Sequence, residues 1–461
     1  MADELKDQLS RFHDRMYTPF DPKTGEGLAR PDPTEAEIAT TYYAPGREAQ
    51  HKYGVVMHAD HETPDDGMCR QARIHARALA AHVPLLLTSI GHRVRYGGVT
   101  VRAAGDDVLR PEVLKEVGEL RHARLRHCVV SVFHTLIYNA QQLKALIVPQ
   151  YVRSQIGAVE RALKSVVVYT PWERSSVDPE VVRVLNKCGQ VWLQCKRNRD
   201  VFVEAGVKES LIRLHPNAFE RGTIADIPVW QKEVPRGRRY YNIGKWEPRK
   251  NQAGLIGAFL LAHRPADHAL LTIKTTRFGK WKNYPTPEEA LEFWMKLDAV
   301  KNKGWTPDTV ARAIRIYDRY FTVDEMVRLH AMHNIYVAAS HAEGWDYPAF
   351  DAKTADNRLV HVGFGGSEDY ADADDVRLPW TLSPVHPDYG WEARARWAEY
   401  DETDLAEAMT RAVPKDSREL RADLEKEYSA HRAGLRMASN LKELVTVTHP
   451  QLVEEMFAEA L

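Results

Sequence analysis

Apolar residues gather in short continuous runs along the chain, and polar loops or helical stretches separate the runs. In the first half, such runs predict strands at 53–57, 83–88, 128–133, 166–169, 191–193 and 211–214. After Pro228, a second series of runs predicts strands at 239–243, 269–273, 314–317 and 335–338. Continuous apolar runs of this length are typical of parallel strands that helices cover on both faces.

Helical stretches fill several of the intervals between these runs. Residues 68–82 are rich in alanine, 251–263 predict an amphipathic helix, and 323–333 predict a further helix. This alternation of strand and helix favours α/β domains with parallel sheets covered by helices. We therefore predict two Rossmann-like domains that face a cleft, with a ligand at the carboxyl ends of the strands.

Composition and the two strand series set the domain boundaries. Residues 1–50 hold few apolar positions and five prolines, which predicts an N-terminal arm. We place the first Rossmann-like domain at 51–225 and the second at 226–440. Residues 441–461 predict a C-terminal helix that can pack back on the first domain.

Bulk composition excludes several classes of protein. Apolar residues make up 44% of the chain and charged residues 28%, which is ordinary for a soluble folded protein. No apolar run approaches the roughly 18–20 residues that span a bilayer, and the first residues lack the apolar core of a signal peptide. We therefore expect a cytoplasmic protein. The cysteines form no CxxC pair, which indicates reduced thiols at Cys69, Cys128, Cys188 and Cys195.

A basic segment directly after a predicted strand is the first candidate for chemistry. It runs from Gly244 to Asn251 and brings Lys245, Arg249 and Lys250 into one strand-to-helix turn. Charge-assisted hydrogen bonds to phosphate oxygens are strong, so this turn is a candidate diphosphate site. A solvated basic loop would have the same composition.

A second segment, 340–352, places two carboxylates around a predicted helix start. Pro348 suits the first turn of a helix, whose backbone amides can bind phosphate groups. Glu343 precedes the helix and Asp351 follows eight residues later, so one can face a sugar and the other a ribose. Alternatively, Asp351 complements the helix dipole and Glu343 is a surface residue. A third segment, 363–366, is rich in glycine and permits close approach of a ligand to the backbone.

Together these segments resemble the donor-binding domain of glycosyltransferase family 4, a family of retaining enzymes with the GT-B fold. Gly244-Lys245 and Lys250-Asn251 stand where the family has Gly-Arg and a Lys-Asn or Lys-Gly pair, so a lysine replaces the usual arginine. The run from Glu343 to Pro348 matches the family's Glu-Gly-Phe-Gly-x-Pro stretch. In that run Asp346 replaces a glycine, and eight residues after Glu343 Asp351 replaces the family's second glutamate.

The first half agrees with this resemblance, which covers roughly residues 53–375. Residues 169–217 are similar to the family's acceptor-side domain, with Trp172 and Glu173 on the acceptor side. Gly67 stands where the family has a glycine-rich loop that contacts the donor. His134, at the end of a predicted strand, matches a sugar-contacting histidine, although an isolated histidine is more often structural.

The resemblance implies retaining transfer of a hexose or similar sugar from a nucleotide diphosphate donor, with UDP as the default, to a hydroxyl acceptor. It implies no metal and no other cofactor. The implied catalytic residues are His134, Lys245, Lys250 and Glu343. The implied donor-binding residues are Gly67, Gly244, Arg249, Gly344, Trp345, Asp346, Tyr347, Pro348 and Asp351. The triplet 372–374 matches the Asp-x-Asp metal motif of another glycosyltransferase fold, but it lies in a polar loop, and we interpret it as chance.

The acceptor and two other functions stay open. The chain carries a net charge of −1, yet residues 51–220 hold 24 Lys and Arg residues against 17 Asp and Glu residues. Such a basic domain could be an ordinary solvated surface. It could also meet a glycan, a lipid-linked acceptor on an anionic membrane, or DNA with a modified base as the acceptor. The alternatives to a transferase are a GT-B nucleotide-sugar epimerase and a catalytically decayed sugar-nucleotide-binding protein.

Overall fold

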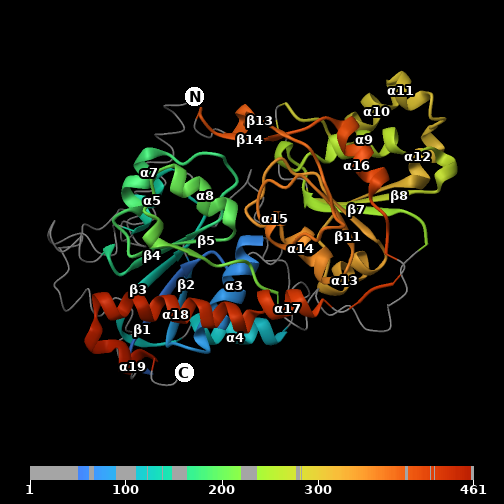
Figure 1. The fold of residues 1–461 in the computed structure, drawn as a ribbon. Helices are drawn as coiled ribbons and strands as arrows, with labels where there is room; N and C mark the ends of the chain where they lie inside the picture. Colours follow the sequence, from blue (N-terminus) through green and yellow to red (C-terminus); the bar gives the residue numbers. More distant parts are fainter. Residues whose placement is uncertain are drawn as a thin grey trace, which may run out of the picture.

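A computed structural model gives the fold of most of the chain. It describes residues 50–61, 67–89, 111–121, 123–137, 139–147, 163–219, 236–276, 281, 283–389, 393–415, 417–419 and 421–457. Residues 1–49 of the predicted N-terminal arm lie outside these ranges. The described residues form two α/β domains side by side (Figure 1).

The first domain is built on a parallel six-stranded sheet with the strand order β2-β1-β3-β4-β5-β6. Its strands are β1 (His51–Ala59), β2 (Leu85–Ser89), β3 (Leu125–His134), β4 (Val166–Thr170), β5 (Gln190–Leu193) and β6 (Ile212–Leu214). Val55, Val56 and Met57 are all fully buried, although successive side chains of a strand point to opposite faces. Burial on both faces explains why the apolar runs of the sequence do not alternate.

Helices cover both faces of this sheet. They are α3 (Gly67–Ala80), α4 (Pro111–Arg121), α5 (Ala140–Ile147), α7 (Pro179–Leu185) and α8 (Lys196–Glu204). Helices α5, α7 and α8 lie on one face, and α3 and α4 lie on the other (Figure 1). Helix α7 shows why the sequence folds this way locally, because Pro179 begins the helix and the Asp178 carboxylate accepts a hydrogen bond from the Glu180 amide.

The second domain has its own parallel sheet, with the order β12-β11-β10-β7-β8-β9. Its strands are β7 (Arg239–Lys245), β8 (Leu270–Thr276), β9 (Ile314–Asp318), β10 (Ile335–Ala338), β11 (Arg358–His361) and β12 (Val376–Arg377). Together the two sheets confirm the predicted α/β fold class. The sequence did not predict β11 and β12, because polar Arg358 and His361 occupy the ends of β11 and because β12 has only two residues.

Eight helices and a hairpin complete the described part of the second domain. The helices are α9 (Gln252–Ala262), α10 (Pro287–Lys296), α11 (Asp298–Lys301), α12 (Pro307–Ala313), α13 (Val323–Ala331), α14 (Tyr347–Thr354), α15 (Ser367–Tyr370) and α16 (Glu402–Arg411), and the hairpin strands are β13 (Thr381–Pro384) and β14 (Arg396–Glu399). The predicted amphipathic character of α9 is wrong, since every residue from Gln252 to Leu260 is buried. Helices α10 and α16 pack against α9, so it has no solvent face.

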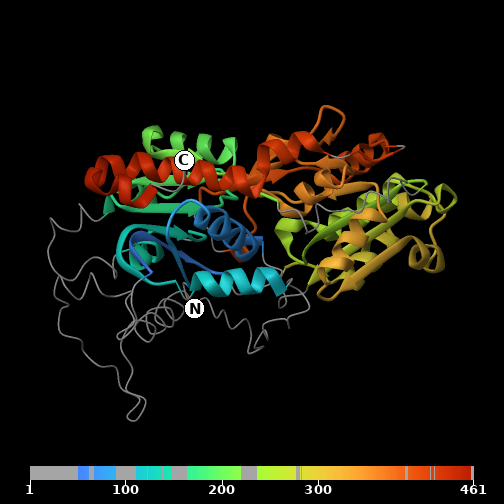
Figure 2. The same ribbon diagram turned by 90° about the horizontal axis from the view of Figure 1, so that it is seen from below.

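The end of the chain returns to the first domain through α17 (Ala422–Tyr428), α18 (Ala430–Thr448) and α19 (Val453–Phe457). Helix α18 packs against α3 and runs along the first domain (Figure 2). The boundary expected at residue 440 falls inside α18. The amide of Phe219 donates to the carbonyl of Tyr428 over 3.1 Å, and the amide of Ala430 donates to the carbonyl of Phe219 over 3.1 Å. The end of the described first domain at Phe219 therefore lies beside residues 428–430 of the returning chain.

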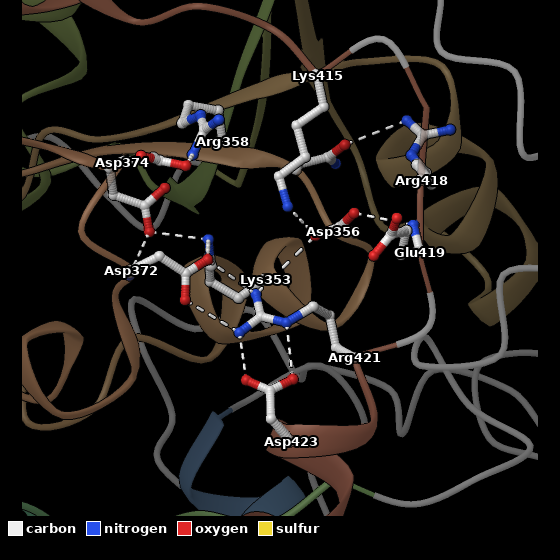
Figure 3. A network of polar contacts seen from close by, with 12 residues as sticks. Lys353, Asp356, Arg358, Asp372, Asp374, Lys415, Arg418, Glu419, Arg421 and Asp423 are labelled. Atoms are coloured by element: carbon white, nitrogen blue, oxygen red, sulfur yellow. Dashed lines mark hydrogen bonds and ion pairs between the residues drawn. The ribbon is translucent and has the colours of Figure 1, made fainter.

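A buried charge network attaches this returning segment to the second domain (Figure 3). Lys353 on α14 is fully buried, and its ammonium lies 2.6 Å from Asp372 and 2.8 Å from Asp375. The guanidinium of Arg421 binds both carboxylate oxygens of Asp372 at 3.1 Å. Asp372, from the Asp-x-Asp triplet, is therefore paired with two cations of the chain itself.

Two further observations concern the chain's environment. Among the described residues, no helix is both long and apolar enough to span a lipid bilayer. All four cysteines carry free thiols, and burial raises the pKa of Cys188 and Cys195 to about 12. These two thiols are therefore protonated at neutral pH and are poor nucleophiles.

Candidate functional site

The candidate site lies where the strand order of the second sheet reverses, between β7 and β10. In open α/β sheets, ligands bind outside the carboxyl ends of the strands at such a point. The two predicted segments, 244–251 and 340–352, directly follow these two strands. They also contact each other, because the amide of His341 donates to the carbonyl of Arg249 over 2.8 Å.

The turn after β7 is shaped so that Lys250 reaches the second segment. A Cβ on Gly244 would lie 3.3 Å from Cδ of Lys250, so glycine leaves room for that side chain. Asn251 takes a left-handed backbone conformation and its side chain accepts from the amide of Gly254, which starts α9. The Lys250 ammonium pairs with the Glu343 carboxylate. Lys245 is exposed at the end of β7.

Glu343 is held as a carboxylate by its neighbours. Its Oε1 contacts the Lys250 ammonium and lies 3.0 Å from the guanidinium of Arg249. Burial disfavours the charged form, but the two cations outweigh it and lower the pKa of Glu343 to about 2. A charged acceptor of hydrogen bonds is therefore held near the carboxyl ends of β7 and β10.

Arg249 lies among carboxylates, although the resemblance implied that it binds the donor. Its guanidinium lies 3.0 Å from Glu173, 2.9 Å from Glu247 and 3.0 Å from Glu343. It also donates to the carbonyl of Ala342 over 2.8 Å. Burial disfavours its charge, but the three carboxylates raise its pKa well above the usual range. In this structure Arg249 orients Glu343 rather than facing an open space.

The two domains touch closely at Gly344. A Cβ there would lie 2.9 Å from Cβ of Pro171 and would also collide with the Gln194 side chain, both in the first domain. Trp172 is buried, and its indole N–H donates to the carbonyl of Ser176 over 3.0 Å. Of the two acceptor-side residues, Trp172 therefore belongs to the core of the first domain.

Helix α14 begins at the carboxylate pair, as the sequence predicted. Tyr347 is its first residue, and Pro348 lies in its first turn. Asp346 caps it with a φ of 67°, in the left-handed region that favours glycine. Burial, with a contribution from Glu343, raises the pKa of Asp346 to about 7. The first amides of a helix lack partners within it, so α14 presents donors beside this carboxyl group.

Trp345, one of the implied donor-binding residues, and the glycine-rich segment have packing roles. Trp345 is buried, with its ring centroid 5.4 Å from that of Phe350 and 5.0 Å from that of Tyr370. In the glycine-rich segment, a Cβ on Gly366 would lie 2.6 Å from Cα of Trp345. Gly365 forms an isolated parallel β-bridge with Glu343. The close backbone approach that we predicted is therefore made by the chain itself, and it holds the Glu343 loop.

The first domain brings the start of α3 to the start of α14. A Cβ on Gly67 would lie 3.6 Å from Cδ2 of Tyr347. One turn later, the guanidinium of Arg70 donates to both carboxylate oxygens of Asp351, over 2.6 and 2.9 Å. The sequence analysis missed Arg70, because nothing in its local sequence indicates a partner 281 residues away.

His134 ends β3 and lies in an aromatic group. Its ring stacks on Tyr169 at 4.3 Å between centroids, and its nitrogens have no hydrogen-bond partner within the described ranges. Burial, reinforced by the neighbouring His75, lowers the pKa of His134 well below its usual range. The imidazole is therefore neutral. The side-chain amide of Gln71 donates to the Tyr169 hydroxyl, which donates to Oδ1 of Asn217. The sequence indicated neither of these contacts.

Part of the predicted basic surface faces the second domain. The amide of Lys196 donates to the carboxylate of Asp369 over 3.1 Å. The guanidinium of Arg197 lies 3.9 Å from the ring centroid of Phe364. Segment 196–199 therefore contributes to the contact between the domains.

The assembled site suits an anion that carries hydroxyl groups. Two lysines and two helix starts supply positive potential, which favours phosphate. Glu343 and Asp351 supply carboxylate oxygens, which accept hydrogen bonds from sugar hydroxyls.

Comparison with known proteins supports this fold through similar structures and not through similar sequences. No family model matches the chain, and no curated protein matches its sequence. Among solved structures, Anabaena HepE in complex with UDP-glucose is similar with a TM-score of 0.52 and 10% identity, over 85% of this chain and 100% of that chain. A glycosyltransferase from Rickettsia africae is similar with a TM-score of 0.50 and 10% identity, over 86% of this chain and 99% of that one. At such identities the likeness shows the fold, which is the two-domain GT-B arrangement of glycosyltransferases.

Proposed function

We propose that this protein is a retaining glycosyltransferase, similar to family 4, that uses a nucleotide diphosphate sugar as donor. The observation that carries the proposal is the meeting of Lys250, Glu343 and the start of α14 at the switch point of the second sheet. The GT-B fold supports it. So does HepE, which has this fold and has been seen with UDP-glucose.

The proposed donor lies across the carboxyl ends of β7 and β10. The diphosphate binds the first amides of α14 and the ammonium groups of Lys245 and Lys250, and Gly244 leaves room for this approach. Asp351 binds the ribose hydroxyls, and Glu343 orients the sugar hydroxyls. His134 and the Gly67 loop contact the sugar from the first domain. Arg249 acts as a positioning residue for Glu343.

The proposed reaction retains the anomeric configuration without a metal ion. The bond between the anomeric carbon and the diphosphate oxygen breaks, and the acceptor oxygen forms its bond on the same face of the sugar. The acceptor's proton moves to the departing phosphate oxygen. Lys245 and Lys250 stabilise the negative charge that grows on the diphosphate, which is electrostatic stabilisation of the transition state.

The first test is donor binding, measured by thermal shift with UDP, GDP, ADP and their sugars. A ligand at about 100 times its Kd stabilises the folded state by about 2.7 kcal/mol, which gives a clear shift in melting temperature. We expect a shift with one nucleotide family, and we expect Lys250→Ala to abolish it. Lys296→Ala is the matched control, because Lys296 is an exposed lysine of the same domain paired with Glu292.

The second test is turnover of the donor that binds. Slow hydrolysis or transfer with retention at the anomeric carbon, followed by NMR, is expected. Isomerised donor in the absence of acceptor would instead support an epimerase. Donor binding by Lys250→Ala that equals wild type would remove the phosphate assignment.

The acceptor is proposed only as a hydroxyl compound, since the structure holds none. Salt-dependent retention on DNA or on anionic liposomes would identify which anionic acceptor the first domain meets. Transfer to a neutral glycan with no retention on either surface would exclude both.

A further inference from the structure

Arg70 and Asp351 form an ion pair between the two domains that conflicts with the proposed donor pose. Arg70 lies in the first turn of α3, and Asp351 lies on α14 of the second domain. Both oxygens of the carboxylate accept from the guanidinium, and the Asp351 side chain is only 3% exposed. Because the Asp351 carboxylate is enclosed and Arg70 lies against both of its oxygens, a ribose hydroxyl can reach them only after Arg70 moves. The proposed donor pose therefore requires that Arg70 leave Asp351.

The position of Arg70 indicates which group its guanidinium can bind after it leaves Asp351. Its guanidinium carbon lies 4.4 Å from the ring centroid of Tyr347, the first residue of α14. The start of α3 at Gly67 adjoins the same ring. A half-buried guanidinium without its carboxylate needs another anion. The diphosphate of the proposed donor would bring that anion to the starts of these two helices.

The charge balance of the site also requires a further cation. Two cations of the site, Lys250 and Arg249, already contact carboxylates, which come from Glu173, Glu247 and Glu343. Oδ1 of Asp346 is buried beside them with no hydrogen-bond partner among the described residues. A diphosphate would add negative charge to a site in which acidic groups already outnumber these cations.

We infer that Arg70 is a further donor-binding residue, which exchanges Asp351 for the donor diphosphate when the ribose takes its place. This inference rests on the proposed function. In the donor-free protein, Arg70 keeps the ribose carboxylate neutralised and the two domains together. In the donor complex, it supplies the first domain's charge to the diphosphate.

The test compares nucleoside diphosphate with nucleoside, by calorimetric titration of UDP and uridine, and likewise of the GDP and ADP pairs. For each protein, the ratio of the nucleoside Kd to the nucleoside diphosphate Kd measures what the phosphates contribute. Arg70→Ala should lower this ratio at least tenfold, because it removes a phosphate contact, whereas the freed Asp351 affects nucleoside and nucleoside diphosphate alike. Arg70→Lys should lower it less, since a lysine keeps the charge but loses the planar fork.

Arg77→Ala is the matched control, because Arg77 lies on the same helix and pairs with Glu116 within the first domain. Its ratio should equal that of the wild type, and melting curves check that every variant is folded. An unchanged ratio in Arg70→Ala, beside a wild type that binds the diphosphate, overturns the role of Arg70 alone. A wild type that binds no nucleoside diphosphate overturns the proposed function together with this inference.

Discussion

The guanidinium of Arg249 lies 3.0 Å from Oε1 of Glu173, and this ion pair joins the second domain to the loop after β4. Burial raises the pKa of Glu173, Arg249 opposes this rise, and Glu343 adds to it. The guanidinium therefore favours the charged form of Glu173, which burial disfavours. Arg249 also connects the Glu343 carboxylate with the first domain, because it contacts both glutamates.

Loss of Glu173 is expected to weaken the contact between the domains. Glu173→Ala leaves a mostly buried guanidinium with one partner fewer, which costs about 1–3 kcal/mol. Glu173→Gln keeps an acceptor oxygen and should cost less. Urea unfolding measures both, and Glu180→Ala is the control because Glu180 lies in an exposed pair with Arg183. A Glu173→Ala protein as stable as the control contradicts this prediction.

Gly344→Ala is expected to push the two domains apart. The new methyl group would lie 2.9 Å from Cβ of Pro171, so the domains must separate slightly. Turnover should fall roughly tenfold or more, because small displacements of reacting groups are costly. Nucleotide affinity should change little, since the proposed nucleotide contacts lie mainly in the second domain. Gly118→Ala is the control, since a Cβ on Gly118 has open space around it. Unchanged turnover in Gly344→Ala would show that closure at this point is unnecessary.

Asp346 is expected to make stability and donor affinity depend on pH. Its pKa is about 7 in the folded protein against an ordinary value of 3.8, so the folded state binds more protons between these values. Stability should therefore fall as pH rises from about 4 to 7, and Asp346→Asn should flatten this slope.

Donor binding gives an independent measurement at the same residue. Above pH 7 the Asp346 carboxylate repels a diphosphate, so affinity for UDP-glucose should decline from pH 5.5 to 8.5. UDP-glucose is the suitable probe because its phosphates do not titrate there. Asp346→Asn should bind equally well across this range, whereas exposed Asp200→Asn should behave as wild type. A wild-type affinity that is independent of pH would contradict the raised pKa.

Lys353 is expected to be essential for stability although it lies outside the cleft. Lys353→Met leaves Asp372 without this cation (Figure 3). It also leaves Asp375, whose side chain is fully buried, without it. Removal of one member of a buried ion pair costs about 3–5 kcal/mol. Chemical unfolding should show this loss, while Lys296→Met in an exposed pair should cost at most about 0.5 kcal/mol. Equal midpoints for the two variants would count against the network.

Local patterns predicted much of the fold but failed for short or fully enclosed elements. The run Val55–Met57 is recognisable because both faces of its strand are buried. Strand β11 was missed because Arg358 and His361 occupy its ends, so that only two apolar residues stand between two polar ones. Helix α9 was expected to have a polar face, but α10 and α16 cover that face. Both helices come later in the chain, so the local sequence of α9 does not indicate them.

The residues of the candidate site likewise divide into those that local sequence indicates and those that it does not. Lys250, Glu343 and Pro348 follow strands in short motifs, so local sequence indicates both their place and their chemistry. Arg70 carries no such motif, because its partner Asp351 is chosen only when two domains meet.

The amino-acid sequence by itself determined the alternation of strands and helices, and the positions of the charged turns that follow the strands. Both depend on contacts between residues a few positions apart. The tertiary structure alone decided which charges meet: Arg249 with Glu173, Arg70 with Asp351, and Lys353 with Asp375. Their pairing depends on how two sheets and a returning helix pack, because electrostatic energy follows distance in space and not position in the chain.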